Sequence, residues 1–103
     1  MDLYFSPLAC SMATRIALHE AGAAANFIEV DGKTKLTRSG EPFLEVNPLG
    51  LVPTLRTDEG DLITENAAIL QYVAARFPQA KLAPSEPLAQ AHLQQWLCFI
   101  GTE

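Results

Sequence analysis

The first half of the chain contains short apolar stretches with the length and composition of β-strands. Residues 1–6 alternate apolar and aromatic side chains, and residues 26–30 form a second short apolar run. Residues 54–57 form a third, and the acidic, glycine-containing turn at residues 58–61 joins it to the apolar pair at residues 62–63. This pattern predicts two strands and then a β-hairpin.

Apolar positions recur with helical spacing in three longer segments. Residues 10–21, 64–76 and 88–100 each place apolar side chains along one side of a helix. We expect Thr64 to cap the second of these helices. A shorter helix is predicted at residues 42–46, with its proline as the first helical residue.

The order of these elements predicts an α/β protein. A strand, a helix and a second strand form a unit whose right-handed crossover makes the two strands parallel. A short helix, a β-hairpin and a longer helix follow, and this order fits the thioredoxin-like fold. Residues 78–87 contain Pro78, Pro84 and Pro87, and we interpret them as a linker before the last helix.

Composition narrows the possible partners. The chain has 103 residues, of which 49% are hydrophobic and 18% charged, as in one ordinary globular domain. A net charge of −5 argues against a nucleic acid or an anionic membrane as partner. No apolar run approaches the roughly 20 residues of a membrane span, and the N-terminus carries no basic or signal-type leader. We therefore expect a cytoplasmic protein that contacts no membrane.

The two cysteines, Cys10 and Cys98, have different surroundings. Neither a Cys-x-x-Cys pair nor a Cys/His ligand spacing is present, so we expect no metal. Cys98 lies among aromatic and aliphatic residues of the last helix, which favours packing in a core. Cys10 lies at the predicted start of a helix, where free N–H groups and the helix dipole favour a thiolate. The alternative for Cys10 is a small buried hydrophobe.

Two further segments are candidates for binding. In residues 47–55, Pro53 stands at the entrance to a strand and donates no ladder hydrogen bond, so one strand edge is left open. Glu65 and Asn66 open a helix whose free N–H groups can hold a carboxylate. The alternative is ordinary helix-start chemistry, in which Thr64 caps the helix and Glu65 opposes its dipole.

These segments carry the motifs of a known family. The sequence Asn47-Pro-Leu-Gly-Leu-Val-Pro-Thr-Leu55, followed by Leu62-Ile-Thr-Glu-Asn-Ala-Ala-Ile69, resembles the glutathione-binding half of a glutathione transferase. The early Pro7-x-x-Cys10-Ser11 is most similar to the bacterial beta class. The resemblance covers residues 1–77 and continues more weakly to the C-terminus.

The resemblance implies a role for each motif residue. Pro53 would follow a cis peptide bond, and Val52 would turn its backbone N–H and C=O toward glutathione. Glu65 would accept from the α-amino group of glutathione, and the Asn66 backbone would donate to its α-carboxylate, although the family more often has serine or glycine at position 66. Lys35 would face the glycine carboxylate, unless it is only a solvated cation of its loop.

The same resemblance implies the chemistry at the sulfur. Cys10 would contact the glutathione sulfur or form a mixed disulfide with it. Ser11 would donate a hydrogen bond to the bound thiolate, as a serine near this point does in other classes. The alternative is that Ser11 satisfies backbone groups at the helix start.

At the level of the whole protein, the resemblance implies a homodimeric transferase that conjugates the glutathione thiolate, as co-substrate, to small hydrophobic electrophiles. Residues 1–77 would be the glutathione-binding domain, residues 78–87 the linker, and residues 88–103 the first helix of an all-helical domain that is otherwise missing. Two alternatives stay open at this point. One is a glutathione-dependent thiol-disulfide oxidoreductase that uses Cys10, and the other is a non-catalytic module for glutathione binding or dimerisation.

Overall fold

A four-stranded mixed sheet forms the centre of the protein. The computed structural model describes residues 1–102. The strands are β1 (Asp2–Phe5), β2 (Asn26–Glu29), β3 (Thr54–Arg56) and β4 (Leu62–Thr64), in the spatial order β2-β1-β3-β4. β1 pairs with β2 in parallel and with β3 antiparallel, and β3 and β4 form the predicted hairpin.

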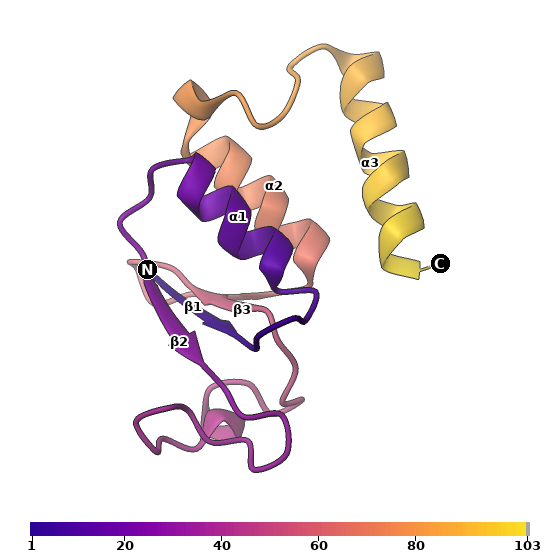
Figure 1. The fold of residues 1–103 in the computed structure, drawn as a ribbon. Helices are drawn as coiled ribbons and strands as arrows, with labels where there is room; N and C mark the ends of the chain where they lie inside the picture. The colour runs from indigo at the N-terminus through magenta and orange to yellow at the C-terminus, as the bar shows by residue number, and fades with distance from the viewer. Residues whose placement is uncertain (103) are drawn as a thin grey trace.

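Two helices cover one face of the sheet. Figure 1 shows α1 (Met12–Glu20) and α2 (Asn66–Arg76) side by side above the strands. The crossover through α1 places β1 and β2 parallel, as the β-α-β pattern predicts. The core between helices and sheet, here called the helical-face core, consists of buried Leu3, Leu18, Ala21, Leu55, Ile69 and Val73.

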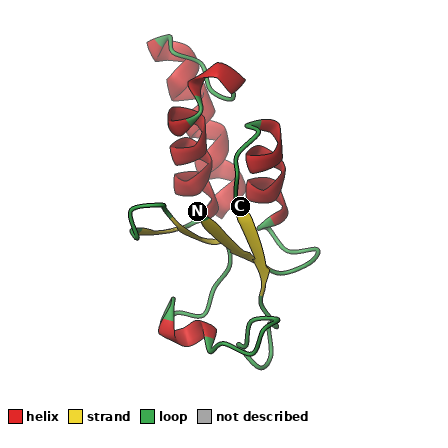
Figure 2. Ribbon diagram, turned by 90° about the vertical axis from the view of Figure 1, so that its left-hand side faces the viewer, coloured by secondary structure: helices red, strands yellow, loops and turns green. Residues whose placement is uncertain are grey.

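An irregular segment covers the opposite face, as Figure 2 shows below the sheet. It spans residues 31–51 and contains a single 3₁₀ turn, η1 (Phe43–Glu45). Its core, here called the loop-face core, joins Phe43 to Tyr4 and Val30, with the Tyr4 and Phe43 ring centroids 5.3 Å apart. Burial raises the pKa of Tyr4, which fits a packing role for this phenol.

The helix starts differ from the prediction in three places. α1 begins at Met12, so Cys10 lies in the preceding turn and Ser11 at the cap position. Thr64 does not cap α2, because it pairs with Thr54 as the last residue of β4. Pro42 precedes η1 with an extended ψ of 109°, so it is the cap residue and not the first helical one.

α3 (Pro87–Thr102) extends away from this core (Figure 1). None of its described residues is fully buried, and Trp96 is 61% exposed. Cys98 is also exposed, so its predicted packing in a core is wrong: α3 contacts α2, which leaves Leu93 and Leu97 half-buried, but Cys98, Phe99 and Ile100 stay exposed. Glu86 accepts hydrogen bonds from the Leu88 and Ala89 N–H groups, which caps the helix and lowers the pKa of this carboxyl.

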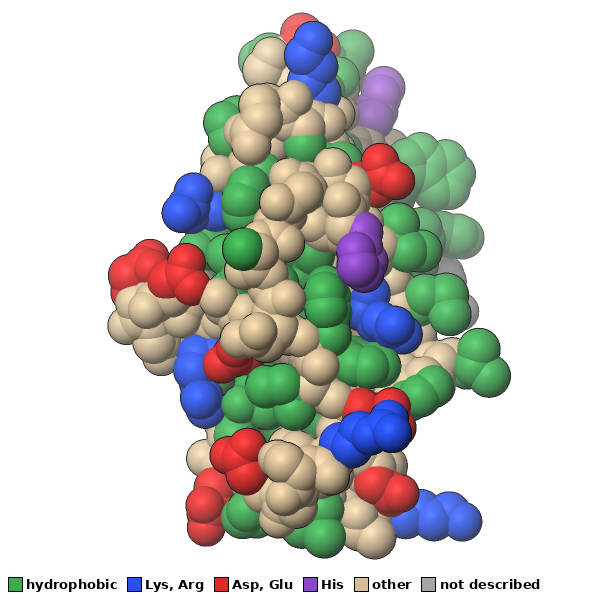
Figure 3. All heavy atoms as spheres, turned by 60° about the vertical axis from the view of Figure 1, so that its left-hand side comes forward, with side chains coloured by type: hydrophobic (Ala, Val, Ile, Leu, Met, Phe, Trp, Pro, Cys, Tyr) green, Lys and Arg blue, Asp and Glu red, His purple; other side chains and the backbone are tan. Residues whose placement is uncertain are grey.

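The segment between α2 and α3 includes a second 3₁₀ turn, η2 (Pro78–Ala80), at its start. Within residues 1–102, no helix combines the length and the hydropathy that a membrane crossing requires. On the face shown in Figure 3, Lys and Arg side chains are scattered among Asp and Glu, with hydrophobic side chains between them.

Candidate functional site

The turn between β1 and α1 presents Cys10. The turn is closed by backbone bonds, among them Ala9 N–H to the Ser6 carbonyl. Leu8 lies in this turn with a φ of 57°, in the left-handed region. The Cys10 thiol is exposed, and its Sγ lies 3.7 Å from the carbonyl oxygen of Val52. The sequence therefore brings together a thiol and a backbone carbonyl that are 42 residues apart.

Ser11 holds this turn from inside. Its side chain is fully buried. The hydroxyl accepts a hydrogen bond from Ser6 N–H and donates one to the Ser6 carbonyl, each at 3.2 Å. Both capacities of the hydroxyl are thus used within the turn. In this structure Ser11 supports the loop that carries Cys10, and its hydroxyl is not free for a thiolate.

A network centred on Asn47 shapes the loop before β3. Asn47 is buried, and its Nδ2 donates to the Leu51 carbonyl and to Thr54 Oγ1, each at 3.1 Å. Thr54 Oγ1 itself donates to the Leu51 carbonyl at 2.9 Å. The Val52–Pro53 peptide bond that follows is cis, as the resemblance implies. Sequence reasoning missed Asn47, although an asparagine before a proline turn is a typical loop-fixing residue.

Lys35 reaches the same loop from residues 31–51. Its Nζ donates to the Gly50 carbonyl at 2.9 Å, two residues before Val52. Gly50 has a φ of 67°, and an added Cβ would meet Leu44 Cδ2 at 3.0 Å and Lys35 Cε at 3.4 Å. Only glycine accepts both the backbone angle and the close approach without displacement. The Lys35 ammonium is therefore held against the loop that leads into β3.

A turn that begins at Asp31 precedes Lys35. Asp31 accepts hydrogen bonds from the N–H groups of Lys33 and Thr34 at 2.8 and 2.9 Å. The Thr34 bond, with a smaller contribution from Lys33, holds the pKa of the Asp31 carboxyl below its usual value. This turn orders the backbone that leads into Lys35.

The start of α2 completes the site. Glu65 has a φ of 74° and a ψ of 126°, a conformation that non-glycine residues rarely adopt and that is typical of ligand sites. The first intrahelical bond runs from Ile69 N–H to the Glu65 carbonyl, so the N–H groups of residues 66–68 precede it. The Asn66 side chain donates from Nδ2 to the Cys10 carbonyl at 2.7 Å.

Three segments thus meet at one end of the sheet, where β1 and β4 end and β3 begins. Cys10 bonds to Val52 through its sulfur and to Asn66 through its carbonyl oxygen. Lys35 contacts the loop that carries Val52, because its Nζ donates to the Gly50 carbonyl. The predicted open strand edge at Pro53 is wrong, because β3 is an inner strand that pairs with β1 on one side and β4 on the other. A thiol, the loop backbone of Val52, a helix N-terminus and an ammonium group form a site suited to an extended, anionic peptide that carries a thiol.

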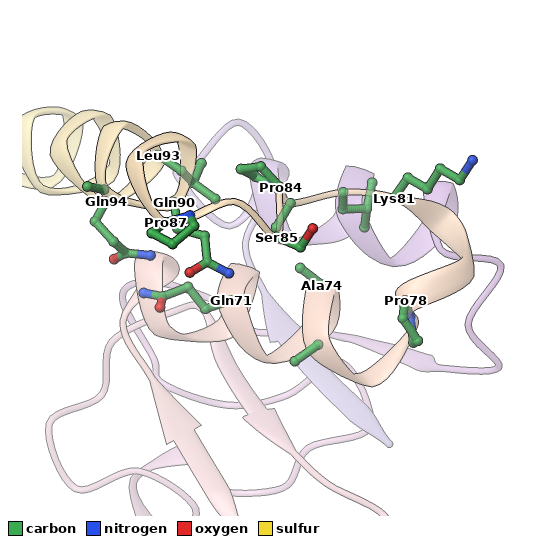
Figure 4. Close-up of a pocket in the computed structure, with 14 residues that line it drawn as sticks. Gln71, Ala74, Pro78, Lys81, Pro84, Ser85, Pro87, Gln90, Leu93 and Gln94 are labelled. Atoms are coloured by element: carbon green, nitrogen blue, oxygen red, sulfur yellow. The ribbon is translucent and has the colours of Figure 1, made fainter.

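A separate hollow of about 1160 Å³ lies away from this site, between α2, the proline-rich segment and α3. Figure 4 shows the side chains of Gln71, Gln90 and Gln94 extending into the space between the two helices. None of the candidate site residues lines it. The chemistry-bearing side chains lie instead at the ends of β1, β3 and β4.

Comparison with known families identifies the family and the fold. The family profile described as "Glutathione S-transferase, N-terminal domain" matches residues 9–76. The chain belongs to the glutathione S-transferase family. This confirms the family that the Asn47–Leu55 and Leu62–Ile69 motifs indicated.

Individual family members agree with that result. Glutathione S-transferase GstA of Escherichia coli O157:H7 is 39% identical over 104 residues, covering 100% of this chain and 52% of GstA. A sphingomonad glutathione S-transferase solved in complex with glutathione is 47% identical with a TM-score of 0.95. The beta-class glutathione S-transferase of Sphingomonas chungbukensis is 47% identical with a TM-score of 0.96. Both structures cover 100% of this chain and 52% of their own.

The likeness confirms the thioredoxin-like fold and the resemblance to the bacterial beta class. The chain spans about half the length of the relatives that it matches.

Proposed function

We propose that this chain is the glutathione-binding half of a glutathione transferase and binds glutathione where Cys10, Val52 and the start of α2 meet. The observation that carries the proposal is the meeting of these three segments. Cys10 Sγ lies 3.7 Å from the Val52 carbonyl, and Asn66 bonds to the Cys10 carbonyl at 2.7 Å. The related sphingomonad enzyme, solved with glutathione, supports this ligand.

Each end of the tripeptide has a suitable partner. Val52, before Pro53, offers its backbone N–H and C=O to the central peptide of glutathione. The backbone N–H of Asn66 donates to the α-carboxylate of the γ-glutamyl group, and Glu65 accepts from its ammonium. Lys35 faces the glycine carboxylate, and doing so requires its Nζ to turn from the Gly50 carbonyl.

The reaction proposed for the whole protein is conjugation of glutathione. The glutathione thiol loses its proton, the thiolate attacks an electrophilic carbon of a small hydrophobic molecule, and the leaving group departs with the electron pair. Cys10 lies beside the sulfur, whereas Ser11 acts through the turn that it holds with Ser6. The contribution of the site is to orient the thiolate and favour its charge.

The remaining parts of the proposal concern the whole protein. Residues 1–77 form the glutathione-binding domain, residues 78–87 the linker, and α3 the first helix of an all-helical domain. The electrophile would bind mainly against that domain, and the protein would act as a homodimer.

The exposed Cys10 thiol favours a second candidate, glutathione-dependent thiol-disulfide exchange. In that reaction Cys10 itself forms the mixed disulfide with glutathione. A third possibility, a non-catalytic binding or dimerisation module, predicts glutathione binding with neither activity.

Intact mass after incubation with oxidised glutathione tests the site in a Cys98→Ser background, because the Cys98 thiol is also exposed, and Cys10→Ala in the same background is the control. We expect one glutathione adduct that is absent from the variant. Conjugation of a chlorodinitrobenzene and reduction of a small disulfide, measured on the same protein, then rank the transferase and the oxidoreductase. Folded protein without an adduct, and without measurable binding of S-methylglutathione, would reject the proposed site.

A further inference from the structure

The side chain of Asn66 makes a contact that helix-start chemistry does not explain. Asn66 is the first residue of α2, where a short polar side chain ordinarily bonds to nearby backbone of its own turn. Its Nδ2 instead donates to the carbonyl oxygen of Cys10, 56 residues earlier in the chain. This bond joins the start of α2 directly to the turn before α1.

The second polar atom of the Asn66 amide, Oδ1, indicates that the bond to Cys10 sets the orientation of the amide. A carbonyl oxygen only accepts, so the atom that faces the Cys10 carbonyl is the donor Nδ2. Oδ1 is then buried with no hydrogen-bond partner among residues 1–102. A buried acceptor without a partner is unfavourable. The Asn66 side chain therefore keeps its bond to Cys10 although this orientation leaves Oδ1 without a hydrogen-bond partner among residues 1–102.

Cys10 has few other restraints. Its carbonyl also accepts a bond from the Ala13 N–H at 3.2 Å, and its sulfur lies 3.7 Å from the Val52 carbonyl. At 2.7 Å, the Asn66 bond is the shortest of the three contacts. Because the carbonyl and the side chain leave the same backbone unit, holding the carbonyl limits the directions in which Sγ points.

We propose that Asn66 is a positioning residue whose side chain directs the Cys10 thiol toward a ligand at Val52. This role rests on the proposed function and adds to the main-chain contact given to Asn66 there. The side chain links the γ-glutamyl end of the site to its thiol end, so both ends of the tripeptide depend on one residue.

Two reagents that attack the same thiol test this role. In the first reaction the Cys10 thiolate attacks one sulfur of oxidised glutathione; the S–S bond breaks, a Cys10–glutathione disulfide forms, and glutathione thiolate leaves and takes up a proton. This reaction needs the thiol to point at a bound tripeptide. In the second, iodoacetamide alkylates Cys10 with loss of iodide, and needs only access.

The measurements use the full chain in a Cys98→Ser background, which leaves Cys10 as the only thiol. For Asn66→Ala we expect disulfide formation with oxidised glutathione to slow by about 3- to 10-fold, the factor equivalent to one ordinary hydrogen bond. Alkylation by iodoacetamide is expected to become faster, because the freed turn exposes the thiol more. Asn66→Ser, which keeps a polar helix start but ends one bond short of Nδ2, should act in the same direction.

Asn26→Ala is the matched control. Asn26 also donates from Nδ2, to Asp2 Oδ1 at 2.9 Å, but it does so at the start of β2, away from Cys10. In Asn26→Ala, the rate of disulfide formation with oxidised glutathione and the rate of alkylation should both equal those of the parent protein. A general loosening of the structure would raise both rates in the Asn66 variants, and this result would overturn the positioning role. So would equal rates in parent and variants.

The test also separates this inference from the proposed function. A parent protein that forms no glutathione adduct would reject the glutathione site. The link between Asn66 and Cys10 would then be judged by alkylation alone. Faster alkylation in Asn66→Ala than in Asn26→Ala would support the link, and an unchanged rate would reject it. A loss of S-methylglutathione binding as large as the loss of rate would make Asn66 a binding residue instead.

Discussion

The two faces of the sheet are built by different means. Leu3 and Tyr4 are neighbours in β1 and point to opposite sides. Leu3 enters the helical-face core, which α1 and α2 close with apolar side chains at regular spacing. Tyr4 enters the loop-face core, where Phe43 of a single 3₁₀ turn is the main partner.

The difference explains where the site lies. The helical-face core supplies stability, because its apolar side chains pack between regular helices and strands that need no unusual φ and ψ angles. The loop face depends on single polar contacts, such as those of Asn47 and Lys35, and it presents the backbone of Val52. The candidate site lies where the two faces meet, at the ends of β1 and β4. Substitutions in the helical-face core should therefore mainly lower the free energy of unfolding, whereas substitutions on the loop face should also lower glutathione affinity.

The largest effect is expected from the helical-face core. Leu3→Ala removes a fully buried side chain from the central strand and should lower the free energy of unfolding by about 2–5 kcal/mol. Leu88→Ala makes the same change on a side chain that is 61% exposed and should cost less than about 0.5 kcal/mol. Urea denaturation measures both, and equal costs would contradict this description of the core.

The Asn47 network should show the next largest effect. Asn47→Ala removes the donor to the Leu51 carbonyl and to Thr54 Oγ1 and the acceptor of the Leu49 N–H, and should cost about 1–3 kcal/mol. Because the network shapes the loop that carries Val52, glutathione affinity should fall more than in Val73→Ala, a helical-face variant of similar cost. Calorimetric titration with S-methylglutathione makes the comparison. If affinity follows stability alone, the loop face has no special link to the site.

Two glycines allow a sharper test of the loop face. Gly50 and Gly60 both have positive φ values, of 67° and 93°, so replacing either with alanine should cost about 1–2 kcal/mol. Only at Gly50 would the new Cβ press on Leu44 and on Lys35. Gly50→Ala should therefore weaken glutathione binding as well, while Gly60→Ala should affect only the melting temperature. Equal affinities in the two variants would argue against Lys35 as a ligand.

The smallest effect concerns pH. The folded-state pKa of Asp31 lies below its ordinary value of 3.8, so its contribution to stability is complete above that value. The contribution is lost as pH falls through the lower, folded-state pKa. The melting temperatures of the parent protein and Asp31→Asn should differ above pH 4 and converge at lower pH. A constant difference over this range would show that the charge of Asp31 is not the cause.

The sequence by itself determined the order of the elements and the family. Helix and strand periodicities are local, so residues 1–6, 10–21 and 26–30 predicted the β-α-β unit from their own apolar spacing. The motifs around Val52 and Glu65 are also short continuous stretches, and they indicated the family before any contact was known.

Tertiary structure alone decided which polar groups meet. The buried hydroxyl of Ser11, the Asn47 network and the bond from Asn66 to Cys10 depend on how loops meet at the end of the sheet. The last of these joins residues 56 positions apart, and no local pattern encodes such a distance. The apolar pattern of α3 likewise predicted a helix correctly but not the exposure of Cys98, because periodicity gives the direction of a side chain and only a packed neighbour buries it.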